Sequence, residues 1–129
     1  MLLSDIREYL KSQIDCPQYY LNKMGSNQDK SITIYNIPGS QPHIAIGGLE
    51  NTTYTTKSIS FLIHWGKNSD EAEQKAMEVY NIFFGQSNLT IGGKRVIQFK
   101  MRTPQPVYLN TDSEGIIEYV IDITIYYER

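Results

Sequence analysis

The sequence has little cysteine, little net charge and no long apolar run, and each shortage argues against a class of protein. A single cysteine among 129 residues, Cys16, cannot form an internal disulfide, which favours a reducing compartment. Twelve Lys and Arg against fourteen Asp and Glu leave a net charge of −2 without a basic run, so we expect no specific nucleic-acid binding. The apolar runs fall far short of the roughly 20 residues that span a bilayer, so no membrane partner is expected.

The composition is that of an ordinary folded chain. Hydrophobic residues make up 40% and charged residues 20%, which is typical of neither a disordered chain nor a coiled coil. The length predicts one domain over residues 1–129, because two domains would each have a small core. The N-terminal run Met1–Asp5 has an acid where a signal peptide needs an apolar stretch, so export by that route is not expected. Ten tyrosines suit both strands and protein interfaces.

Two helices are predicted from apolar spacing and capping residues. The first covers Asp5–Gln13, with Ser4 as its N-cap, and the second covers Asp70–Phe84, with Asn68 or Ser69 as its N-cap. Apolar residues recur at helical spacing in both: Ile6, Tyr9, Leu10 and Ile14, and then Ala72, Ala76, Val79, Tyr80 and Phe83.

Strands dominate the rest of the chain. Alternating or β-rich segments predict strands over residues 18–21, 31–35, 43–46, 58–65, 89–91, 94–101 and 117–127. Gly92-Gly93 predicts a tight hairpin turn, and loops are expected over residues 23–30 and 49–56. The residues between Met101 and Ile116 are expected to form a long loop or a broken pair of strands. The element order lacks regular βαβ alternation. It therefore predicts an α+β fold, a mostly antiparallel sheet with two helices packed on one face.

Few residues suggest chemistry. Cys16 with His43 or His64 is a conceivable thiol pair, but a buried cysteine and a surface histidine explain them more simply. Asp112 and Glu114 are best explained by a turn. We predict no catalytic residue, no metal site and no cofactor. The alternative is a small monomeric enzyme or ligand-binding domain that uses Cys16, His64 or the Asp112 loop.

Several stretches, in order and spacing, resemble the bacteriophage minor capsid and tail terminator family, and together they cover most of the chain. They are Leu2–Ile6 with Tyr9-Leu10, Pro42–Ile46, Ile59–Phe61, Ser69–Ala72, Val79-Tyr80, Pro106, Leu109, Asp112–Gly115, Glu118–Val120 and Tyr126–Arg129. The chain departs from the family pattern at His64-Trp65-Gly66, where a basic residue near the end of the central strand is expected.

The resemblance implies a structural virion protein of a phage or prophage, not an enzyme. Such a protein forms a homo-oligomeric ring, commonly a hexamer, that caps the tail tube, ends its polymerisation and joins it to the head. Its partners would be further copies of itself, the tail tube protein and head connector proteins. Its place would be the head–tail interface of the virion, reached through the bacterial host cytoplasm during assembly.

A head-to-tail ring needs two different complementary patches on each copy. We hypothesise that Tyr126, Tyr127 and Arg129 contribute to subunit contacts, because Tyr and Arg are favoured at the centres of interfaces. Leu49–Lys57 and Thr103–Asn110 are candidates for strand pairing between subunits.

Overall fold

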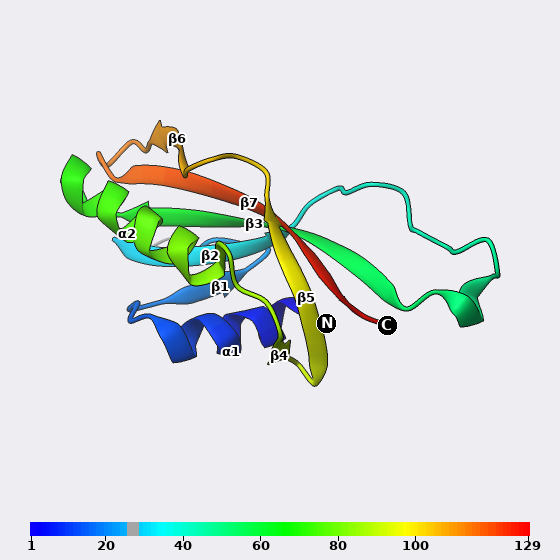
Figure 1. Ribbon diagram of the computed structural model, residues 1–129. Coiled ribbons are helices and arrows are strands. Elements are labelled where there is room, and N and C mark those ends of the chain that lie inside the picture. Colours follow the sequence, from blue (N-terminus) through cyan, green and yellow to red (C-terminus); the bar gives the residue numbers. More distant parts are fainter. Residues whose placement is uncertain (26–28) are drawn as a thin grey trace.

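Two helices pack against one face of a curled seven-stranded sheet in the computed structural model, which describes residues 1–25 and 29–129 (Figure 1). In chain order the elements are α1 (Leu3–Gln13), β1 (Tyr19–Leu21), β2 (Lys30–Asn36), the 3₁₀ turn η1 (Leu49–Asn51), β3 (Tyr54–Trp65), α2 (Ser69–Phe83), β4 (Leu89–Ile91), β5 (Lys94–Met101), β6 (Val107–Thr111) and β7 (Ile117–Glu128). The pairing of β1 with β2 is parallel, and the other described pairs are antiparallel. The predicted α+β class and mostly antiparallel sheet are confirmed.

The two longest strands, β3 and β7, form the centre of the sheet. The strand order is β1-β2-β3-β7-β5-β4, and β6 also pairs with β7. β6 pairs with the first part of β7, at Ile117–Val120, whereas β5 pairs with the second part, at Ile123–Tyr127. β6 and β5 therefore lie one after the other along the same edge of β7.

The core lies between the sheet and the two helices. The alternation predicted for β3 and β7 is confirmed, because their inward side chains are buried together with those of β2 and both helices: Ile32, Ile34, Ile59, Phe61, Ile63, Ile121, Ile123, Ile125, Ile6, Leu10, Val79 and Phe83. The Phe83 ring stacks on that of Phe61, with centroids 5.0 Å apart, and lies 5.9 Å from that of Tyr9 on α1. Burial of each large apolar side chain contributes roughly 1.5–3 kcal/mol, which fixes both helices on this face.

The helix ends follow from local capping. Asn68 is the N-cap of α2, and its Oδ1 accepts a hydrogen bond from the Glu71 N–H at 3.0 Å, as its spacing predicts. The first helix begins earlier than predicted, because Leu2 and not Ser4 is the N-cap. The reason is that the Asp5 carboxylate accepts a hydrogen bond from the Leu2 N–H at 2.8 Å, and this bond closes the helix from inside its first turn.

The hairpin between β4 and β5 is confirmed, with Gly92 and Gly93 at φ values of +58° and +77°. These angles belong to the left-handed region that glycine adopts without strain. A Cβ atom at Gly92 would also lie 2.6 Å from the Asp5 carboxylate, so the turn is packed against the start of α1.

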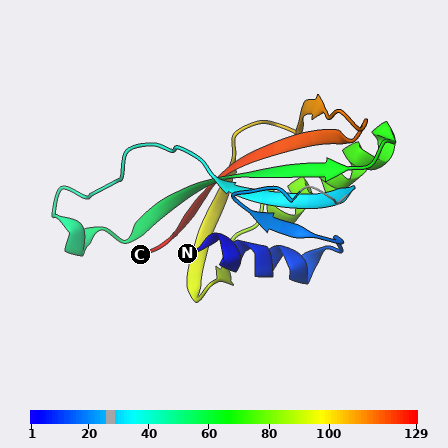
Figure 2. The ribbon, with the colours of Figure 1, turned by 180° about the vertical axis from the view of Figure 1, so that it is seen from behind.

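The predicted strand over His43–Ile46 is wrong. Residues 37–53, which we call the arm, leave the end of β2 and project away from the helices and the rest of the sheet before the chain returns as β3 (Figures 1 and 2). Within the arm, Ala45 donates its N–H to Thr52 Oγ1 at 2.9 Å and accepts from the Gly48 N–H at 2.9 Å. The β-favouring residues are there, but no neighbouring strand of the described chain lies alongside them.

Three other segments are expected as loops or broken strands. β3 begins at Tyr54 within the expected 49–56 loop, because the register with β7 extends to the pair Tyr54 and Glu128. Residues between Met101 and Ile116, expected as a long loop or a broken pair of strands, contain the short strand β6, which is exposed along its whole length. Residues 26–28 of the loop expected over 23–30 lie outside the described residues.

Candidate functional site

The structure brings two of the residues considered for chemistry together. His64, near the end of β3, places its Nε2 2.8 Å from Oδ2 of Asp112 in the turn before β7. The sequence predicts His64 on a polar, solvent-facing side of its strand, but the residue is only 4% exposed. Glu118, the register partner of His64 on β7, is also buried. The signal that sequence reasoning missed is the pairing of β3 with β7, which places the Asp112 turn over the histidine.

Asp112 is also the organiser of its turn. Its Oδ1 accepts hydrogen bonds from the Glu114 and Ile116 N–H groups, both at 2.9 Å. The hydrogen bond from His64, followed by that from Ile116, holds the pKa of Asp112 below its ordinary value. Burial raises the pKa of Glu118 nearby, against the opposing attraction of His64. The predicted turn role of Asp112 is confirmed, and the contact with His64 adds a link to β3.

The other ring nitrogen of His64 faces a buried polar layer. Ser31 of β2 is the register partner of His64, and Thr33 follows on the same face of that strand. Ser31 Oγ, Thr33 Oγ1 and His64 Nδ1 are buried without a hydrogen-bond partner in the described part of the chain. Ser31 Oγ and His64 Nδ1 are therefore not hydrogen-bonded to each other, so Ser31, His64 and Asp112 are not linked as a nucleophile, a base and an orienting acid. Ser31 is also fully buried, so a substrate cannot reach its hydroxyl group.

Cys16 is separate from this cluster. It lies between α1 and β1, and β2 separates β1 from β3, which carries His64. Its Sγ donates to the Gln18 carbonyl at 3.1 Å, and burial raises the pKa of the thiol. A raised pKa lowers the fraction of thiolate, which is the nucleophilic form. His43 lies elsewhere again, on the arm, where it stacks on Tyr54 with centroids 5.0 Å apart. The geometry therefore does not assemble the conceivable thiol pair.

The three residues of the interface hypothesis lie in three different settings. Tyr127 packs against the core, and Tyr126 lies on the opposite face beside Lys100. Arg129 donates from Nη1 to the Leu49 carbonyl, and its N–H donates to the Thr53 carbonyl at 3.1 Å. The C-terminal residue is thus hydrogen-bonded to the last part of the arm, before β3 begins. Their role in subunit contacts stays a prediction.

The arm carries three exposed apolar residues. Ile46 is fully exposed, Ile44 is 59% exposed, and Leu49 is exposed beside them. The base of the arm is anchored, since Arg102 donates to Ser58 Oγ at 2.8 Å and to the Pro38 carbonyl at 3.3 Å. Isolated apolar side chains on a surface are ordinary, but three on one projection suit a docking surface.

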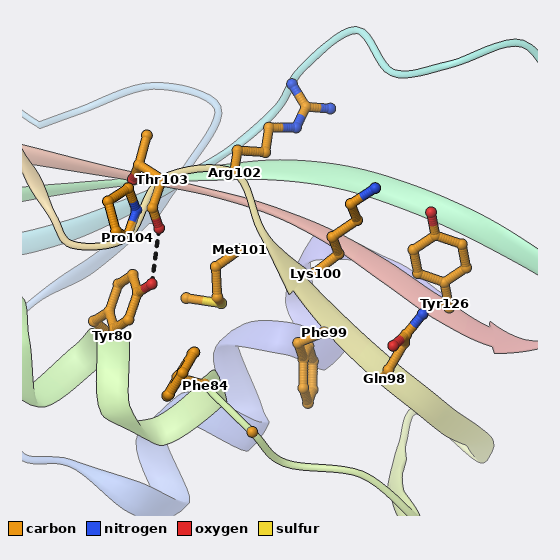
Figure 3. A pocket seen from close by; sticks show the side chains of 11 residues that line it. Tyr80, Phe84, Gln98, Phe99, Lys100, Met101, Arg102, Thr103, Pro104 and Tyr126 are labelled. Carbon is orange, nitrogen blue, oxygen red and sulfur yellow. Dashed lines mark hydrogen bonds between the residues drawn. The ribbon is translucent and has the colours of Figure 1, made fainter.

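A second apolar surface is a groove between the C-terminal end of α2 and β5. This β5 groove has a volume of about 730 Å³, and its apolar side is formed by Tyr80, Phe84 and Met101 (Figure 3). The Phe84 ring is 59% exposed, although it stacks on Tyr80 at 5.6 Å between centroids. The Tyr80 hydroxyl group donates to the Thr103 carbonyl at 2.7 Å, which fixes the chain that leaves β5. Lys100 and Arg102 also line the groove and make its charge positive.

The predicted pairing candidates both contain strand edges. Leu49–Lys57 holds η1 and the first residues of β3, which pair with β7 on one side. Thr103–Asn110 holds most of β6, which also pairs with β7 on one side. Val107, Tyr108 and Leu109 are exposed on β6.

Two searches of the described residues concern other site classes. Among residues 1–25 and 29–129, no three His, Cys, Asp or Glu side chains lie close enough together to hold a metal ion. No helix in the same residues is long and apolar enough to cross a membrane.

Comparison with known families decides what kind of protein this is. A family model described as bacteriophage tail terminator protein matches residues 4–129, which is nearly the whole chain. The chain belongs to the bacteriophage tail terminator family. Membership of this family supports a structural role in a phage tail. The resemblance inferred from the sequence is confirmed.

Other comparisons give this tail terminator no closer functional relative. No curated protein matches the chain at a significant level. One solved structure is similar to it with a TM-score of 0.46 and 17% identity, over 99% of this chain and 95% of that one. A likeness at this distance carries no argument about function.

Proposed function

We propose that this tail terminator forms a closed ring that caps the tail tube, ends its growth and joins it to the head. The observation that carries the proposal is the match of the tail terminator family over residues 4–129. The ring is commonly six-membered in proteins that this chain resembles, and its partners are the tail tube protein and head connector proteins. The ring assembles in the host cytoplasm and remains in the virion at the head–tail interface.

Two properties of the surface support assembly by docking. Apart from Leu2, the large exposed apolar residues lie on the arm, in the β5 groove and on β6, where they are available to other chains. These surfaces differ from one another, as a head-to-tail ring requires, since a single self-complementary patch closes as a dimer. The net charge of −2 also suits a channel for DNA, because strong positive charge would hold the phosphate backbone.

The C-terminal hypothesis fits the same proposal. Tyr126 lines the β5 groove, and Arg129 fastens the arm through Leu49 and Thr53. Replacement of Tyr126 and Arg129 by Ala is therefore expected to weaken subunit contacts without unfolding the core. An intact ring in that double variant, measured by light scattering, would remove the hypothesis.

The proposal is tested with the full chain and tail tubes of the same phage. The purified protein, carrying a gold-labelled C-terminal tag, is mixed with preformed tubes and imaged by electron microscopy. We expect label at one end of each tube, and a ring of uniform copy number when the bound protein is released and weighed by native mass spectrometry. Label along the tube wall would indicate a tube component instead. Unlabelled tubes and a strictly monomeric protein would reject the proposal.

A further inference from the structure

The outer edge of β5 ends without a partner strand in the described part of the chain. β4 pairs with β5 at Lys94–Val96, so the later residues of β5 lie beyond it. The Arg102 N–H donates to the Asp122 carbonyl of β7 at 3.0 Å. Because backbone groups point alternately to the two sides of an antiparallel strand, those of Phe99 and Met101 point away from β7. They point to the side where the β5 groove separates β5 from the end of α2 (Figure 3).

The arm contains a segment suited to pairing with this free edge of β5. Residues 43–46 are β-favouring, and Ala45 turns its N–H and carbonyl inward, toward Thr52 and Gly48. The backbone groups of Ile44 and Ile46 form no hydrogen bond within the described residues. Ile44 lies in the extended part of the arm and Ile46 in the turn that the bond from the Gly48 N–H to the Ala45 carbonyl closes, and both side chains are exposed. A segment predicted as a strand thus keeps a β-favouring sequence, but no strand of the described chain lies beside it.

The two surfaces match in length, apolar character and charge. Five residues span roughly 17 Å when extended, so residues 42–46 of the arm match the β5 edge 97–101 in length once Ile46 straightens out of its turn. Phe99 and Met101 face the helix side of the sheet, so an added strand with Ile44 and Ile46 on that side would cover the exposed Phe84 ring. The arm's one charged residue is an acid, Glu50. The groove lining contains two cations and no acid.

We infer that residues 42–46 of one copy add as a strand to the free edge of β5 in the next copy and fill its groove. The inference rests on the proposed ring and names the contact that closes it. Each copy gives its arm to one neighbour and its β5 edge to the other, so the contact is head-to-tail and joins several copies into a ring. Main-chain hydrogen bonds supply affinity in such strand addition, and the alternate side chains supply specificity.

Single variants test each half of the contact. Ile46→Asp places a charge on the arm and Phe84→Asp places one in the groove, both at exposed positions. Leu2→Asp at the start of α1 is the matched control, since it changes an exposed apolar residue that lies outside the arm, the β5 groove and β6. Copy number is measured by native mass spectrometry, for the protein alone and for protein released from tail tubes. We expect the first two variants to lose the ring, at least tenfold in the assembled fraction, and the control to keep it.

A mixture of the two variants gives the sharper test. Ile46→Asp retains a good β5 edge and Phe84→Asp retains a good arm, so one junction can form between them and no other. We expect each variant to stay monomeric alone and the mixture to yield a one-to-one pair that grows no further. Hydrogen exchange is expected to slow on assembly in peptides covering 43–48 and 97–102, and thermal unfolding of each variant should show an intact fold.

The outcomes separate the inference from the proposed function. A ring that survives in both Ile46→Asp and Phe84→Asp, or that is lost in Leu2→Asp instead, would overturn the strand addition and leave the tail terminator role standing. Unchanged exchange at 43–48 and 97–102 on assembly would overturn it as well. A wild-type protein that forms no ring, alone or on tubes, would reject both.

Discussion

Phe61 shows how single residues hold the fold. It is fully buried at the centre of β3, and its ring stacks on Phe83 of α2 at 5.0 Å. Phe61→Ala is expected to lower the free energy of unfolding by about 3–5 kcal/mol, through lost burial and the cavity left behind. Urea unfolding followed by circular dichroism measures the change.

The matched control for this prediction is Phe84→Ala, the same substitution at an exposed ring of α2's C-cap. It is expected to change stability by less than about 1 kcal/mol, because little area is buried there. Equal losses in both variants would contradict the placement of the core.

The ionisation of Asp112 makes the free energy of unfolding depend on pH in the acidic range. His64 and the Ile116 N–H stabilise its ionised form, so its pKa in the folded chain is lower than in the unfolded one. Such a group contributes stability above its unfolded pKa of about 3.9, and that contribution is lost as the pH falls through the folded pKa. We expect Asp112→Asn to be less stable than the wild type at pH 6 and to lose less stability between pH 5 and pH 2. Parallel pH profiles in urea titrations would rule out this role.

Glu118 has the opposite effect. Burial raises its pKa, so its contribution is complete below the unfolded value of about 4.3 and is lost as the pH rises through the folded value. Glu118→Gln is therefore expected to gain stability relative to the wild type at pH 7 and to gain less at pH 4. Glu114→Gln, at an exposed position in the turn before β7, is the control and should change stability little. A loss of stability at pH 7 in Glu118→Gln would show that the ionised form is favoured.

The burial of some of these residues can be predicted from the sequence, and that of others cannot. The inward face of β3 was predictable because alternation along one strand records which side is covered. The burial of His64 was not predictable, because Asp112 lies 48 positions away and covers it only through the register of β3 with β7.

At the scale of elements, α2 depends on its cap. Asn68 accepts the Glu71 N–H, one of the donors that a helix leaves without a partner at its start. Asn68→Ala is expected to lower stability by about 1 kcal/mol, measured as a reduced urea midpoint. Asn81→Ala, at an exposed position within the same helix, should leave stability unchanged or slightly higher, because Ala has the better helix propensity. Equal effects at both sites would mean that the cap adds nothing.

Element prediction succeeded where local signals and tertiary packing agree. The helix at 69–83 and the glycine hairpin at 92–93 carry capping and turn residues that act within a few positions. His43–Ile46 carries a strand pattern as strong as that of β2, but no strand of the described chain lies beside it. β propensity shows only that a segment can form a strand. A strand also needs a partner strand, which the fold supplies for β2 and which, as we infer, a second copy supplies for residues 42–46.

At the scale of the whole molecule, the buried polar cluster and the exposed apolar surfaces lie in different places. The polar cluster around His64 and Asp112 is buried, whereas the arm and the β5 groove present apolar surface outward. This division is suited to a protein that works through contacts between chains, which agrees with membership of the tail terminator family. The family could be inferred from the order of motifs along the sequence. The projection of the arm could not, because it depends on where the pairing of β2 with β3 ends.

The most direct test of the account is the length of tail tubes grown in the presence of this protein. Tail tube protein of the same phage is polymerised with and without the purified full chain, and tube lengths are measured by electron microscopy. The account predicts that tubes stop growing once the protein is bound at one end, so that the length distribution becomes shorter and stays constant with time. Tubes that continue to lengthen at the same rate, with the protein present in excess, would contradict it.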